Sequence, residues 1–188
     1  MHFLRRTLTL GALVLGICLM ATTAVAQDTT HSTIDNDTDF ETVVRGIDTL
    51  PNIEMFTDRW PDAEERLIEL ALDQERSEYL RWRATSLLAN FSTDAVEQTL
   101  VELTEAEERR IRAMAYTILT GAFLDDGDDG LFELIERGLG DESDQVRHRI
   151  VRTLPHADHP DAESLLRRLA EDDSDPQVQR LATRALGQ

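Results

Sequence analysis

One apolar pattern occurs four times beyond Pro61. An apolar residue is followed by mostly apolar residues four, seven and eight positions later, as in Leu80, Ala84, Leu87 and Leu88. This spacing places all of them on one face of a helix. The first positions, 80, 111, 146 and 178, lie 31, 35 and 32 residues apart. Self-similarity at such a period is typical of a solenoid, in which each repeat packs only against its neighbours.

Each of these helices is preceded by another amphipathic segment, so the pattern predicts four helical hairpins. A single hairpin cannot bury its apolar stripe, whereas stacked hairpins bury a continuous one. Phe40 to Leu50 shows the same spacing and is stopped by Pro51, which predicts an N-terminal capping helix. The preceding helices are carried by Leu67, Ile68 and Ala71, by Val96, Leu100 and Leu103, by Leu131, Leu134 and Ile135, and by Leu165, Leu166 and Leu169.

The turns before the second helices add a resemblance. The chain resembles the HEAT-repeat family in its short bacterial form, most closely in the turn motifs Asp144-Gln-Val-Arg147 and Asp175-Pro-Gln-Val. The resemblance extends from roughly Pro61 to Gln188. The resemblance implies an all-α fold, an α-solenoid of about four HEAT-like hairpins with a capping helix over residues 40–188. It also implies a ladder of turn aspartates and arginines between repeats. We expect that ladder to be incomplete, because Glu78 and Arg109 replace the aspartate and Gln179 replaces the arginine.

The first 26 residues have the layout of a secretory signal peptide. Arg5 and Arg6 precede an apolar run, and Ala24-Val25-Ala26 is a small-residue cleavage site. A membrane anchor and a lipid attached to Cys18 are the alternatives. We predict an exported protein, periplasmic or secreted, with no membrane span after cleavage and a disordered acidic linker at residues 27–39.

Charge excludes one class of partner. The formal net charge is -18, and it falls to -20 when Arg5 and Arg6 leave with the signal peptide. Because such a surface repels phosphate backbones, we predict no nucleic-acid binding. Cys18 is the only cysteine, so the exported chain is expected to have no disulfide and no thiolate ligand.

The most distinct local motif is an acidic loop. Asp125, Asp129, Glu133 and Glu136 occupy positions one, five, nine and twelve of a pattern that resembles a calcium-binding EF-hand loop. Gly127 stands where the third ligand is needed, and the loop falls where the solenoid needs a turn between repeats. We therefore expect no cofactor, and keep calcium as the alternative, in which these carboxylates stiffen the third repeat.

The sequence shows few features that would indicate an enzyme. His156, Asp158, His159, Asp161 and Glu163 are ligand types for zinc, but Pro155 and Pro160 break the segment, so it is interpreted as another turn. The iron-dependent hydroxylases built from HEAT-like repeats carry His-Glu dipeptides, and this sequence has none. We expect a protein that is not an enzyme.

The second helices are the expected binding surface. They hold most of the arginines, whereas the first helices form an acidic outer wall. At about 100° per residue, the third, sixth and seventh positions of the pattern point away from the core. We predict a monomeric protein-binding scaffold whose concave, second-helix face binds an unknown protein through an acidic or extended segment. The predicted contact residues are Trp82, Tyr116, His148, Val151, Arg152, Arg180 and Arg184.

Overall fold

The structure is a computed structural model that describes residues 39–46, 52–125, 127–157 and 159–187. The expected signal peptide, and the expected linker up to residue 38, lie outside the described residues. Residues 39–44 are helical and Arg45 is in a turn, so the capping helix ends earlier than the predicted Leu50. The sequence pattern missed the next helix, α2 (Ile53–Arg59), in which Asn52 accepts a hydrogen bond from the amide of Met55 at 3.1 Å.

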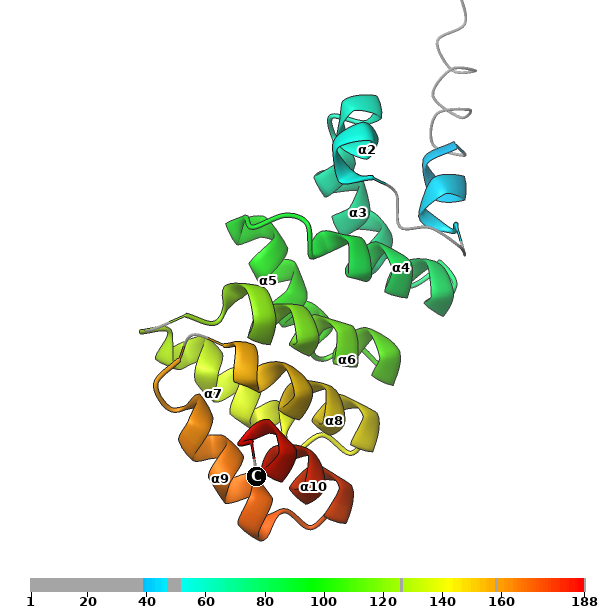
Figure 1. Cartoon of the computed structure of the whole chain (residues 1–188). Helices are drawn as coiled ribbons and strands as arrows, with labels where there is room; N and C mark the ends of the chain where they lie inside the picture. Colours follow the sequence, from blue (N-terminus) through cyan, green and yellow to red (C-terminus); the bar gives the residue numbers. More distant parts are fainter. Residues whose placement is uncertain (1–38, 47–51, 126, 158, 188) are drawn as a thin grey trace, which may run out of the picture.

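Four helical hairpins follow α2 and stack in one direction (Figure 1). The predicted α-solenoid is therefore confirmed, with each predicted helix in its place. The first helices are α3 (Ala63–Leu72), α5 (Asp94–Leu103), α7 (Asp129–Gly138) and α9 (Ala162–Asp172). The second helices are α4 (Glu78–Leu88), α6 (Arg109–Ile118), α8 (Asp144–Thr153) and α10 (Pro176–Ala185).

Short polar side chains begin most of these helices. Ser77, Thr93 and Asp128 each accept a hydrogen bond from the backbone amide three residues later, at 3.4, 3.3 and 2.8 Å. Asp175 accepts one from the amide of Gln177 at 2.7 Å, and Pro176 takes the first helical position, where it displaces no hydrogen bond. These four side chains thus fix where α4, α5, α7 and α10 begin.

Two of the second helices do not end as regular α-helices. A π-helical turn, Leu119–Phe123, extends α6, and a 3₁₀ turn, Leu154–His156, extends α8. The two extensions contact each other, and Leu119 and Leu154 are fully buried between repeats. The two extensions are thus part of the contact between the second and third hairpins.

The second helices pack more closely than the first ones. The pairs α4 and α6, α6 and α8, and α8 and α10 contact one another, whereas α3 with α5 is the one substantial pair of first helices in the described chain. The small fifth-position residues Ala84, Ala115 and Ala182 are fully buried, which permits this close approach. The second helices thus form the more continuous layer of the stack.

Candidate binding surface

The predicted binding residues fall into two groups in the structure. Trp82 and His148 are half-buried, and Arg152, Arg180 and Arg184 are exposed, all on the second-helix face. Tyr116 and Val151 are 4% and 0% exposed, so their assignment to the contact surface is wrong. Both stand at the sixth position of the pattern, as does Thr85, which is also fully buried.

The next repeat covers the sixth position. A Cβ atom added to Gly138, at the end of α7, would lie 2.6 Å from the ring of Tyr116. The tyrosine therefore fills the space above a glycine of the following hairpin. Its burial raises the pKa of the Tyr116 phenol, against the smaller opposing effect of a hydrogen bond with Thr104. The ring is a contact between repeats rather than a contact for a partner.

The fourth position of the pattern is more accessible than the sixth in α8. Arg149 is exposed there in α8, and Leu181 is half-buried in α10. A single helix viewed down its axis places the fourth position closer to the apolar stripe than the sixth. The neighbouring hairpin covers the sixth position and leaves the fourth accessible. The periodicity within one repeat therefore could not have predicted that Arg149 is exposed.

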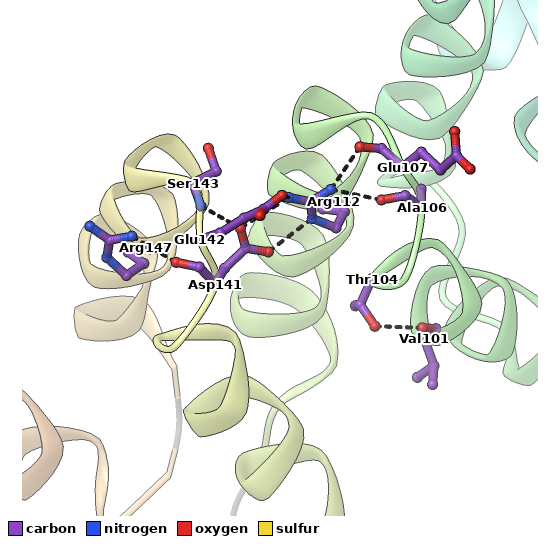
Figure 2. A network of polar contacts seen from close by, with 9 residues as sticks. All are labelled: Val101, Thr104, Ala106, Glu107, Arg112, Asp141, Glu142, Ser143 and Arg147. Atoms are coloured by element: carbon purple, nitrogen blue, oxygen red, sulfur yellow. Dashed lines mark hydrogen bonds and ion pairs between the residues drawn. The ribbon is translucent and has the colours of Figure 1, made fainter.

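Several second-helix arginines are used inside the fold. Arg81 donates to Glu108 at 2.6 Å, and Arg147 pairs with Asp175 at 3.5 Å. Arg112 makes two hydrogen bonds to the carboxylate of Asp141, at 2.9 and 3.0 Å, as Figure 2 shows. Each of the three arginines is the second residue of the pattern and reaches an acid in the turn of the next repeat. The ladder therefore has one such arginine–carboxylate pair, which we call a rung, at each of the three junctions between repeats. The expectation that the ladder is incomplete is wrong.

The middle rung is the most developed one. Arg112 also donates to the backbone carbonyl groups of Ala106 and Glu107, at 2.9 and 2.8 Å (Figure 2). Burial acts to raise the pKa of Asp141, but hydrogen bonds from Arg112 and from the Ser143 amide outweigh it and hold the pKa below its usual value. The hydrogen bond to Asp141 likewise raises the pKa of Arg112. Arg147 then donates to the Asp141 carbonyl at 2.7 Å, which links two rungs.

Six other second-helix arginines have no such role. Their guanidinium groups make no ion pair or hydrogen bond with any residue that the structure describes, and all six are exposed. Two lie at the start of α6, and four lie on α8 and α10. They are Arg109, Arg110, Arg149, Arg152, Arg180 and Arg184.

The four arginines of α8 and α10 surround one groove, which we call the arginine groove. It consists of two adjoining hollows of about 320 Å³ each, which share Arg152 and Gln177 as lining residues. Asp144 is its one lining carboxylate, against four arginines. The remaining lining residues are Gln145, His148 and Leu181.

The other half of the second-helix face has a different character. A hollow of about 630 Å³ at the start of α6 is lined by four glutamates and three arginines, so its charges nearly cancel. Trp82 lies on α4 beside Tyr79, with the ring centroids 6.0 Å apart. Of these hollows, the arginine groove is thus the one with an excess of positive charge. The charged lining residues of the hollow at α6 are Glu78, Glu107, Glu108, Glu142, Arg109, Arg110 and Arg112.

The predicted calcium ligands are spread over the acidic loop and α7. Asp128 caps α7, Asp129 is the first residue of that helix, and Glu136 pairs with Arg168 of α9. Asp125 and Glu133 are exposed. No three histidine, cysteine, aspartate or glutamate side chains converge within the described residues, which leave out Asp126 and Asp158.

The histidines proposed as ligands or catalysts are kept apart. His148 Nε2 lies 3.2 Å from Asp175, and the pKa of that carboxyl is lowered, first by the amide of Gln177 and further by His148. His159 is buried, stacks on Phe132 with ring centroids 4.1 Å apart, and accepts a hydrogen bond from the Asp161 amide at 3.2 Å. Its Nε2 lies 4.0 Å from Asp129. His156 is exposed on the 3₁₀ turn.

Comparison with known families identifies the last two hairpins. Residues 129–188 match the family described as HEAT repeats. They contain the whole of the arginine groove, so the groove lies in the part of the chain that is similar to HEAT repeats. No curated protein matches the chain.

Solved structures show the same fold over more of the chain. Human deoxyhypusine hydroxylase is 23% identical over 66% of this chain, with a TM-score of 0.54. A designed armadillo repeat protein in complex with the peptide (KR)4 is 14% identical over 79% of this chain and 71% of its own, with a TM-score of 0.50. An engineered protein is 18% identical over 86% of this chain and 74% of its own, also with a TM-score of 0.50.

These likenesses concern the fold. The chain spans 42% of the human hydroxylase. Repeat proteins of this shape include both an enzyme and a peptide-binding design, so the fold alone leaves open whether the chain is catalytic. Among the residues that the structure describes, no helix has the length and hydropathy to cross a membrane.

Proposed function

We propose that the protein is a non-catalytic scaffold that binds another protein on its second-helix face, outside the cytoplasm. The observation that carries this proposal is the set of six exposed arginines on that face that have no hydrogen-bond or ion-pair partner among the described residues. Arginine is enriched at the energetic centres of protein interfaces. An arginine that stabilised only the solenoid would be expected to pair with a turn acid, as Arg81, Arg112 and Arg147 do.

The comparisons and the histidines support the same proposal. The designed armadillo protein is a stack of helical repeats solved with an extended peptide, which is an example of what such a surface can do. A catalytic role would need titratable groups that converge in one pocket. Here His148 lies on α8, whereas His156 and His159 lie between α8 and α9, and no three histidine, cysteine, aspartate or glutamate side chains converge among the described residues. The sequence also lacks the His-Glu dipeptides of the iron-dependent hydroxylases. Export is proposed from the signal-like residues 1–26 alone.

Site-specific photo-cross-linking in the source cells tests this function. A photoreactive residue replaces Arg110 on α6 or Gln177 on α10, both on the second-helix face. In the matched control it replaces Gln98, which is exposed on the outer helix α5. We expect the same defined cross-linked protein from both second-helix positions and none from Gln98. Equal cross-linking from Gln98, or none from any position, would contradict the scaffold proposal.

Fractionation of the same cells tests the location. We expect the protein and its cross-linked product in the periplasm or the medium, with the chain shortened at about residue 26. A full-length chain that remains in the cytoplasm would contradict export but leave the binding surface untouched.

A further inference from the structure

The arginine groove carries an inference about the chemistry of the partner. We infer that the groove between α8 and α10 is the docking site for a short, extended acidic segment of a partner protein. This inference rests on the proposed scaffold function and deepens it.

The first step is the charge of the groove. Four exposed arginines and one carboxylate line it, in a chain whose formal net charge is -18. Arg149, Arg152, Arg180 and Arg184 have no acidic partner among the described residues, although acids are abundant nearby. Asp175, the acid closest in sequence to Arg180, is already bound by Arg147 and His148. The groove thus holds positive charge that the fold itself does not neutralise.

The second step is geometry. Arg149 and Arg152 are three residues apart on α8, and Arg180 and Arg184 are four apart on α10, so each pair lies on one side of its helix, about 5–6 Å apart. Alternate side chains of an extended peptide lie about 6.6–6.8 Å apart on one face. An extended segment with an acid at every second residue therefore matches the arginine spacing. Each guanidinium can bind a carboxylate through two parallel hydrogen bonds.

The third step concerns the surroundings of the groove. The first helices of the same two hairpins carry exposed acids, among them Glu133, Glu163 and Glu171. A long polyanion, such as a nucleic acid, would extend past the groove and meet this like charge. A short acidic segment would end before it reached these acids. Gln177 and the half-buried Leu181 supply a hydrogen-bonding group and an apolar contact at the middle of the groove, which suits a peptide backbone better than a bare anion.

Peptide binding to the full exported chain tests the inference. The probe is a fluorescent peptide of alternating glutamate and serine, and the controls are the same peptide with glutamine or lysine in place of glutamate. We expect the glutamate peptide alone to bind, and to bind more weakly as salt is added. The double variant Arg152→Gln/Arg180→Gln is expected to weaken binding about tenfold or more.

A matched double variant controls for charge. Arg137→Gln/Arg167→Gln removes the same charge from exposed arginines on the first helices α7 and α9, outside the second-helix face, and we expect it to leave the affinity within about twofold. The side chains of Arg137, Arg152 and Arg180 make no hydrogen bond or ion pair with the described residues, and Arg167 makes only an exposed pair with Glu163, so both variants are expected to keep the parent melting temperature.

Three results would overturn the inference. The first is no binding of the glutamate peptide up to about 1 mM. The second is an equal loss in the two double variants. The third is single-stranded DNA binding as tightly as the peptide, which would make the groove a general anion site. A cross-linked partner still captured at Gln177 by the Arg152→Gln/Arg180→Gln variant would also reject the inference, while the scaffold function would stand.

Discussion

Arg112 donates hydrogen bonds to two backbone carbonyl groups of its own repeat and to both carboxylate oxygens of Asp141 in the next one. Both side chains are 11% exposed. Removing one member of a pair that is so enclosed leaves the other without compensation, which costs more than losing a surface ion pair. The rung is therefore a sensitive point of the stack.

Asp141→Asn is expected to lower the free energy of unfolding by about 2 kcal/mol at neutral pH. Urea denaturation measures the change. The matched control is Glu142→Gln, because Glu142 is 90% exposed and lies 3.7 Å from Arg112. We expect that variant to change stability by less than about 0.5 kcal/mol. Equal effects of the two variants would show that the Asp141 rung is no stronger than a surface pair.

The same rung predicts a dependence on pH. The pKa of Asp141 is lower in the folded chain than its usual value, so its contribution is fully present above the unfolded value of about 3.9 and is lost as the pH falls through the lowered folded value. The stability difference between the parent and Asp141→Asn should therefore shrink below about pH 4. Denaturation curves at several pH values would show it, and a constant difference down to acid unfolding would contradict it.

Gly138→Ala tests the contact between repeats that buries Tyr116. The new Cβ would lie 2.6 Å from the tyrosine ring and 2.7 Å from Ile150, so we expect a loss of about 1–3 kcal/mol in unfolding free energy. Gly130→Ala is the control in the same helix, where a new Cβ would lie 3.6 Å from the Asp128 carboxylate, an ordinary contact. That change is expected to be neutral or stabilising by up to about 1 kcal/mol.

The helices show how far periodicity alone reaches. Each of the eight predicted hairpin helices is present, because the stripe that repeats in the sequence is the stripe that the stack buries. Helix α2 was missed because only Phe56 of its seven residues is buried, so it has no periodic stripe. The surface assignment failed at Tyr116 and Val151 because a neighbouring hairpin, which no single-helix pattern describes, covers them.

The fifth position of the second helices gives a test at the level of helix contact. Ala84 and Ala115 are fully buried in α4 and α6, and a leucine there would force the helices apart. We expect Ala84→Leu or Ala115→Leu to destabilise the chain by about 1–3 kcal/mol. Ala95→Leu, at an exposed position of α5, is the control and should leave the melting temperature nearly unchanged. Unchanged stability in all three variants would mean that the core face is misplaced.

Over the whole stack, two uses of arginine are separated along the chain. The arginines at the second position of α4, α6 and α8 join one repeat to the next. Those at the third and seventh positions of α10, and at the fourth and seventh of α8, are left for the groove. The sequence shows that the arginines gather on the second helices. It could not show which of them join repeats and which line the groove, because both sets are arginines with a helical spacing.

The distribution of exposed apolar side chains over the molecule bears on its oligomeric state. The large exposed apolar side chains of the described chain, Met55, Tyr79 and Val101, lie on three different helices and form no continuous patch. On α10, Val178 and Ala182 are fully buried, and Leu181 is half-buried with Arg180 and Arg184 beside it. Stable self-association generally needs a larger apolar surface than this.

We therefore expect a monomer, measured by light scattering on the exported chain over a range of concentrations. Leu181→Glu decides between a monomer and a dimer that associates through α10, because it places a charge at the apolar centre of that helix surface. The parent and the variant should have the same monomeric mass. A parent dimer that becomes monomeric in Leu181→Glu would refute the prediction, and it would also mean that a second copy competes with the acidic segment for the arginine groove.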